Sequence, residues 1–156
     1  MRLQFEEAAR KAARQLARGL RRSNAARLFG FSLTAAEPGR ATLKMRVRER
    51  HMQIHGVVHG GVLAALADTA GALGCFLALP RGARLATIEM KINYLEPVVA
   101  GVLVAEGRML RKGKNFCVAE CDVREGARLV AKSLLTFAIL DPDRSLAVKH
   151  AGKGKR

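Results

Sequence analysis

The chain has 156 residues, enough for one domain with a hydrophobic core. Hydrophobic residues make up 49% and charged residues 26%, which excludes a disordered chain, and three cysteines without metal-ligand spacing exclude a disulfide scaffold and a zinc site. The formal net charge of +15 favours an anionic partner: nucleic acid, a membrane surface or a phosphorylated small molecule.

The first predicted element is a basic amphipathic helix over residues 1–22, where apolar side chains recur at helical spacing. The segment lacks the apolar centre of a secretory signal, and its two acidic residues are untypical of a mitochondrial presequence. We therefore expect a cytoplasmic protein in which this helix packs at the edge of a main domain over 23–144. A basic tail follows over 145–156.

The middle of the chain predicts a strand, a loop and a long helix. Residues 23–33 are turn-like, and residues 41–47 alternate apolar and polar side chains, which is typical of a strand. Residues 48–58 have no period and are expected to form a loop. Residues 60–79 are apolar nearly all round, so they predict a helix that is buried on all sides and ends at Pro80.

The second half of the chain predicts four strands at hairpin spacing, over residues 84–97, 102–110, 115–123 and 128–140. Cys117 and Cys121 fall in the third of these strands and are expected to be core residues in a reducing compartment. Because one long apolar helix precedes the strands, the predicted fold class is α+β, an antiparallel sheet wrapped around a central helix.

The junction before the predicted helix, HGVVHGG at 55–61, brings two histidines and three glycines to its start. The first amides of a helix lack internal partners and carry partial positive charge, so the Gly60 amide is a candidate site for a carbonyl oxygen that becomes an oxyanion. Gln53 and His59 can add donors or orient the bound group. The alternative for His59 is structural, as an N-terminal cap or in a loop hydrogen bond.

Asp68 is the only charged residue of the helix 60–79. An ionised carboxylate is costly to bury unless it is paired or hydrogen-bonded, and near the centre of a bilayer it would cost about 2.5–3.5 kcal/mol. We therefore expect no membrane span, and we consider Asp68 a candidate catalytic group. The alternative is a structural hydrogen bond to the backbone or to Thr69.

Helix geometry constrains how Gly60 and Asp68 can cooperate. Eight residues separate them, so they lie about 12 Å apart along the axis of one helix. Groups that act on one carbon atom must lie within about 3 Å of it. One copy of the helix cannot supply both groups, whereas two antiparallel copies can. If both groups are catalytic, the protein is at least a dimer with sites at the interface.

The segment HGVVHGGVLAALADTAG at 55–71 resembles the HGGxxxxLxD-type motif of hotdog-fold acyl-CoA thioesterases. It is most similar to the PaaI-like branch of the 4-hydroxybenzoyl-CoA thioesterase superfamily, over residues 29–140. INYLEPV at 92–98 and the basic turn RKGK at 111–114 belong to the similarity. The resemblance implies a hotdog fold assembled as a dimer or dimer of dimers. It also implies hydrolysis of an acyl-CoA to free acid and CoA, without a metal or other cofactor.

The resemblance also implies roles for individual residues. Asp68 is the general base for water or the nucleophile on the thioester carbonyl, which the Gly60 amide polarises with His59 nearby. Thr87 lies near the attacking water, and Gln53 occupies a position where related enzymes contact the substrate or water. The implied substrate and CoA contacts are Gly61, Arg111, Lys112, Gly113 and Lys114.

Two other functions stay open at this point. One is a hotdog hydratase or dehydratase acting on acyl thioesters. The other is a non-catalytic module. Such a module would bind acyl-CoA, in a regulatory role, or would bind nucleic acid through its positive charge. Stacking side chains for single strands are scarce, with one Tyr and no Trp, and the N-terminus predicts only one clear helix. We therefore expect no specific nucleic-acid binding.

Overall fold

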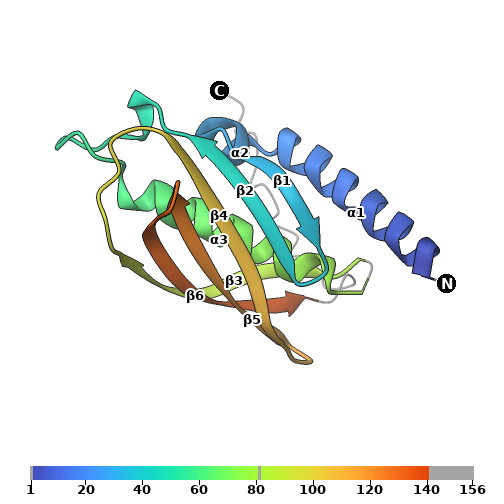
Figure 1. Cartoon of the computed structure of the whole chain (residues 1–156). Helices are drawn as coiled ribbons and strands as arrows, with labels where there is room; N and C mark the ends of the chain where they lie inside the picture. The colour runs from blue at the N-terminus through green and yellow to red at the C-terminus, as the bar shows by residue number, and fades with distance from the viewer. Residues whose placement is uncertain (1, 81, 141–156) are drawn as a thin grey trace, which may run out of the picture.

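The computed structural model describes residues 2–80 and 82–140. A curled antiparallel sheet wraps around one long helix, α3 (Gly60–Leu77), and a second long helix, α1 (Arg2–Arg22), lies outside the sheet (Figure 1). This confirms the predicted α+β class. The predicted basic tail over 145–156 and the end of the predicted main domain, 141–144, lie outside the described residues.

The sheet has six strands in the order β1-β2-β4-β5-β6-β3, all antiparallel to their neighbours. The last four strands in the chain were predicted within a few residues of their observed ends. β1 and β3 form the two edges of the sheet. The strands are β1 (Ser32–Glu37), β2 (Arg40–Arg46), β3 (Arg84–Tyr94), β4 (Val102–Lys112), β5 (Phe116–Glu125) and β6 (Arg128–Leu140).

The turn-like joint expected over 23–33 is wrong, because this segment forms a short helix and the start of a strand. Helix α2 (Asn24–Phe29) begins at Ser23, whose hydroxyl accepts the Ala26 amide at 3.3 Å. It ends at Gly30, whose φ of 74° is the left-handed conformation that glycine adopts without strain. β1 follows directly and pairs with β2.

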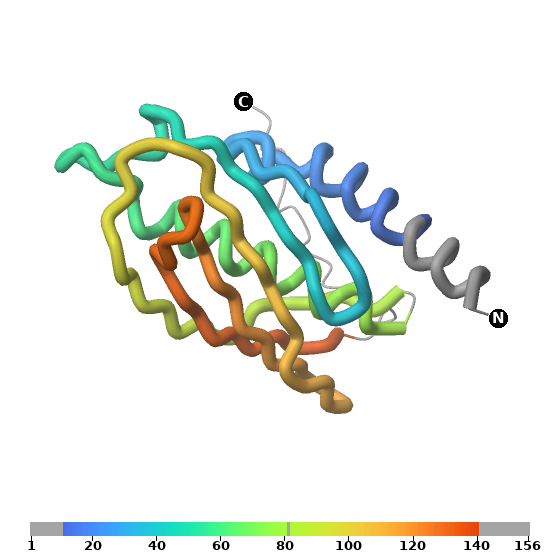
Figure 2. Tube along the Cα trace, in the orientation of Figure 1, coloured from blue at the N-terminus to red at the C-terminus, as the bar shows by residue number. Residues whose placement is uncertain are grey.

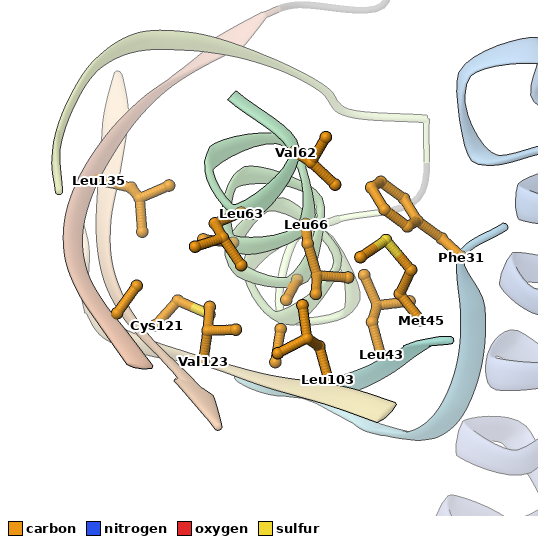
Figure 3. Packing of buried hydrophobic residues seen from close by; sticks show 14 of the residues in the cluster. Phe31, Leu43, Met45, Val62, Leu63, Leu66, Leu103, Cys121, Val123 and Leu135 are labelled. Carbon is orange, nitrogen blue, oxygen red and sulfur yellow. The ribbon is translucent and has the colours of Figure 1, made fainter. Parts of the chain in front are cut away.

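One side of α3 forms the core with the sheet, as the view along the helix shows (Figure 3). Small residues on both elements let them approach closely. A Cβ on Gly107 of β4 would overlap the backbone of Ala70, and one on Gly74 would lie 3.0 Å from the Gly107 carbonyl oxygen. The buried residues of α3 are Val62, Leu63, Leu66, Ala67, Ala70, Gly71, Gly74 and Cys75.

The opposite side of α3 is open in the single chain, so the prediction of burial on all sides is wrong. Ala64, Asp68 and Ala72 on this side are only half-buried, and Phe76 is 39% exposed. The reason is geometric, because one curled sheet covers only one side of a helix. Within the described residues, α3 is the one helix that is long and apolar enough to cross a membrane. The core helix of a folded domain passes the same test, and α3 packs on the sheet.

Candidate active site

Asp68 lies on the open side of α3, next to the edge strand β3. Thr87 of β3 donates a hydrogen bond from its hydroxyl to Asp68 Oδ1 at 2.9 Å. Burial raises the pKa of the Asp68 carboxyl above its ordinary value, and the Thr87 hydrogen bond offsets part of this increase. The alternative of a bond between Asp68 and Thr69 is not realised, because the Thr69 hydroxyl donates to the Ala65 carbonyl at 2.7 Å.

The first turn of α3 leaves one amide available. His59 caps the helix, and its Nδ1 accepts the Gly61 amide at 2.9 Å. The amides of Val62 and Leu63 donate to the His59 carbonyl, at 2.9 and 3.4 Å. Among the residues that the structure describes, the Gly60 amide has no acceptor. The candidate oxyanion donor is therefore Gly60, whereas Gly61 is occupied by the cap.

Tyr94, the last residue of β3, covers the helix start. A Cβ placed on Gly60 would lie 3.1 Å from Tyr94 Cζ and 3.3 Å from its hydroxyl oxygen. A side chain at position 60 would therefore crowd this ring, which gives a physical reason for glycine there. Sequence reasoning did not assign Tyr94 to the site. Its position in the INYLEPV segment, which is part of the resemblance, was the available signal.

Gln53 lies in a loop that closes on itself just before α3. The backbone amide of Gln53 donates a hydrogen bond to the Val57 carbonyl at 2.8 Å, and its backbone carbonyl accepts one from the Gly56 amide at 3.0 Å. At the base of the loop, the backbone amide of His59 donates a hydrogen bond to the backbone carbonyl of the buried His51 at 2.8 Å. The loop thus connects Gln53 to the helix start through backbone hydrogen bonds.

The basic turn over 111–114 lies at the other end of α3. Arg111 and Lys112 end β4, and the Gly113 amide closes the turn on the Phe116 carbonyl at 2.8 Å. Lys112 Nζ donates to the carbonyl of Ala78, the C-terminal cap of α3, at 3.2 Å. Arg111 and Lys114 are exposed. Within one chain, the turn therefore lies far from Gly60.

The structure thus brings Asp68 and Thr87 into contact, and it places His59 and Gly60 at the start of α3, beside the loop that carries Gln53, as a separate group. α3 is a continuous helix between them, so the axial separation of about 12 Å holds for the single chain. Each chain presents two halves of the predicted arrangement rather than one complete site. Within residues 2–80 and 82–140, no group of three His, Cys, Asp or Glu side chains could hold a metal ion.

The comparisons with known proteins point to one family. A family model described as the thioesterase superfamily matches residues 55–132. Acyl-coenzyme A thioesterase 13 of Homo sapiens is 31% identical over 113 residues, which cover 70% of this chain and 80% of that protein.

Two solved structures are similar to the whole domain. A thioesterase from Haemophilus influenzae has a TM-score of 0.76 at 30% identity, over 88% of this chain and 92% of that chain. A mutant of the phenylacetic acid degradation protein PaaI from Thermus thermophilus has a TM-score of 0.70 at 27% identity, over 76% of this chain and all of that chain (100%).

The curled sheet around one helix, with a carboxylate on the open side of that helix, has the hotdog architecture of thioester hydrolases. The chain belongs to the thioesterase superfamily, since that model matches half of it and relatives of about 30% identity align over most of their length. The family resemblance and the assignment as a thioester hydrolase are confirmed.

Proposed function

We propose that the protein hydrolyses an acyl-CoA thioester to a free acid and CoA, with Asp68 as the general base. The observation that carries this proposal is the Asp68–Thr87 pair on the open side of α3. Thr87 occupies Oδ1 and leaves Oδ2 for a water molecule. Burial brings the pKa of the carboxyl closer to neutral pH, where a base works best. The name of the human relative, an acyl-coenzyme A thioesterase, supports CoA esters as the substrates.

The reaction proceeds by addition of water and loss of the thiol. The thioester oxygen accepts a hydrogen bond from the free Gly60 amide, and this bond stabilises the negative charge that develops on the oxygen. Asp68 takes a proton from water while the water oxygen bonds to the carbonyl carbon. The carbon–sulfur bond then breaks, and the leaving sulfur takes the proton from Asp68. Water and thioester give acid and thiol in balance, so the reaction needs no cofactor.

The active assembly is a dimer or a dimer of dimers in which each site combines two chains. The support is the separation of Gly60 and Asp68 along α3. β3 supports it further, because this edge strand of 11 residues pairs only with β6 among the described strands and carries Thr87. Antiparallel pairing of β3 with its copy would place the helix start of one chain near the carboxylate of the other.

The exposed cations of the basic turn, Arg111 and Lys114, are the proposed contacts for the CoA phosphates. Lys112 is already engaged with the end of α3, so its contribution to CoA binding is smaller. The three cysteines are free and buried, which suits the reducing cytoplasm that we propose as the compartment.

The test is a thiol-release assay with a panel of aromatic, short-chain and long-chain acyl-CoAs, with wild type beside Asp68→Asn. We expect kcat of the variant to fall by about a thousandfold, because general-base catalysis contributes roughly 10²–10⁴-fold. The matched control is Glu37→Gln, which neutralises an exposed carboxylate on β1, the edge of the sheet opposite β3, and should leave kcat unchanged. A fully active Asp68→Asn protein would contradict the proposed mechanism. A wild-type protein that releases no thiol would favour a binding module.

A further inference from the structure

A cavity of about 420 Å³ lies beside the C-terminal half of α3, where α1, α3 and β3 meet. Its volume is within the range of about 300–1,000 Å³ that is usual for small-molecule pockets. Five of its six lining side chains are apolar, and the sixth is an exposed arginine, whose stem can line an apolar wall while its charge stays in water. The lining residues are Leu16, Ala72, Leu73, Phe76, Arg84 and Leu85.

Two elements lead from the candidate carboxylate to this cavity. On α3, Ala72 and Phe76 follow Asp68 at intervals of four residues, so they lie about 6 and 12 Å further along the axis. On β3, Leu85 precedes Thr87 by two residues, which puts both on one face of the strand about 7 Å apart.

α3 and β3 run in opposite directions, as the chain trace shows (Figure 2). The C-terminal half of α3 therefore lies beside the N-terminal half of β3. Because Thr87 is hydrogen-bonded to Asp68, both elements place the near end of the cavity about 6–7 Å from the carboxylate. The far end of the cavity, at Phe76, lies about 12 Å from it.

We propose, on the basis of the proposed function, that this cavity holds the distal part of a straight-chain aliphatic acyl group. An extended alkyl chain with bonds of about 1.5 Å advances about 1.3 Å per carbon. A path of about 6–12 Å from the carboxylate therefore corresponds to roughly the fifth to tenth carbon. The preferred substrates are medium-chain acyl-CoAs, from octanoyl to decanoyl. A butyryl group is too short to enter the cavity.

Helix α1 forms the wall that limits chain length. Leu16 of α1 lines the cavity together with Leu73 and Phe76 of α3, and α1 packs on β1 as well as on α3. α1 lies outside residues 55–132, the segment that matches the family model. Chain-length selection thus depends on an element outside that segment, whereas the reacting groups Asp68 and Gly60 lie inside it.

The experiment compares kcat/KM for butyryl-, octanoyl-, decanoyl-, hexadecanoyl- and phenylacetyl-CoA in wild type, Leu16→Phe and Leu16→Ala. Wild type should prefer the octanoyl and decanoyl esters to the butyryl and phenylacetyl esters. Leu16→Phe fills the cavity, so the ratio of decanoyl to butyryl activity should fall by roughly tenfold or more. Leu16→Ala enlarges the cavity and should shift the preference toward hexadecanoyl-CoA.

The matched control is Leu28→Phe, the same substitution on α2 at a leucine that is 65% exposed and outside the cavity. It should leave the preference unchanged. A decanoyl to butyryl ratio that is equal in wild type and Leu16→Phe would overturn the proposal, as would a wild-type preference for butyryl- or phenylacetyl-CoA.

Binding separates failure of this proposal from failure of the proposed function. If wild type hydrolyses none of the esters, the hydrolase mechanism is wrong, and calorimetry with butyryl- and decanoyl-CoA then tests whether the cavity binds the acyl chain. Tighter binding of decanoyl-CoA that is lost in Leu16→Phe would support the cavity as the acyl site. Equal affinities for the two esters would overturn it.

Discussion

At the residue scale, the Asp68 carboxyl combines two opposing influences on its pKa. Burial raises it, and the hydrogen bond from Thr87 lowers it. In the proposed role of general base, Asp68 must be ionised to take a proton, so activity should be lost as pH falls through the pKa of this group. Because that pKa is raised, the acid limb of the pH profile should lie above the ordinary aspartate value of about 3.9.

Replacement of Thr87 by valine tests whether Thr87 lowers the pKa of Asp68, because the expected pH shift has a definite direction. The Thr87→Val change keeps the volume and removes the hydrogen bond that lowers the pKa of Asp68. We expect the acid limb of kcat to move to higher pH and kcat itself to fall, because the carboxylate is no longer held in place. The measurement is kcat from pH 4 to 9 for both proteins. An acid limb that stays fixed or moves to lower pH would show that Thr87 does not tune Asp68.

The catalytic roles assigned from the sequence stay predictions, and the structure shows only which of the candidate residues lie together. Asp68 and Thr87 were singled out, and the structure brings them together. The sequence named the Gly60 amide as the candidate donor and an N-terminal cap as the alternative for His59, but that the cap occupies the Gly61 amide depends on the rotamer of His59, which no sequence pattern specifies. Tyr94 was missed because its contact with Gly60 depends on where β3 ends relative to the start of α3, a property of the tertiary fold.

At the scale of elements, periodicity predicted α3 and five of the six strands. The sixth, β1, was missed because SLTAAE contains little alternation of large apolar side chains, and an edge strand is only half-buried. The burial of α3 was overpredicted for a different reason. Hydrophobicity reports how apolar a helix surface is, and it does not report which part of that surface the same chain covers.

The close contact between α3 and β4 gives a prediction about stability. A Cβ on Gly107 would overlap the backbone of Ala70, which has no flexible side chain to give way. Gly107→Ala should therefore reduce the free energy of unfolding by about 1–3 kcal/mol or more, through overpacking. Chemical denaturation measures this.

The control for that substitution is Gly19→Ala on α1. A Cβ on Gly19 meets nothing within 4 Å, and alanine favours a helix interior by roughly 0.5–1 kcal/mol relative to glycine. This variant should be slightly more stable than wild type. If Gly107→Ala is as stable as Gly19→Ala, the sheet does not pack on α3 as closely as described.

At the scale of the whole molecule, the proposed sharing of each site between two chains predicts that two inactive variants complement each other. Asp68→Asn loses the base, and Gly60→Val crowds Tyr94 and blocks the oxyanion position. A mixed dimer would combine the intact Gly60 of one chain with the intact Asp68 of the other. Random mixing makes half of the dimers mixed, with one good site each, so activity should reach about a quarter of wild type.

Co-expression of the two variants with different affinity tags, followed by purification on both tags, isolates the mixed species. The thiol-release rate per dimer should be about half of the wild-type value. Each variant expressed alone is the control and should be inactive. Mixed dimers without activity would mean that each site uses Gly60 and Asp68 of a single chain, which the length of α3 makes difficult.

The closed loop before α3 has a consequence for how the protein can vary. Its backbone hydrogen bonds join Gln53 to Val57 and His51 to His59, so the base of the loop is fixed independently of its tip. Ile54 at that tip is 94% exposed and makes no part of the core. Substitutions at Ile54 should therefore leave the start of α3 in its geometry, so the chain can vary in sequence at this point with little cost to the fold.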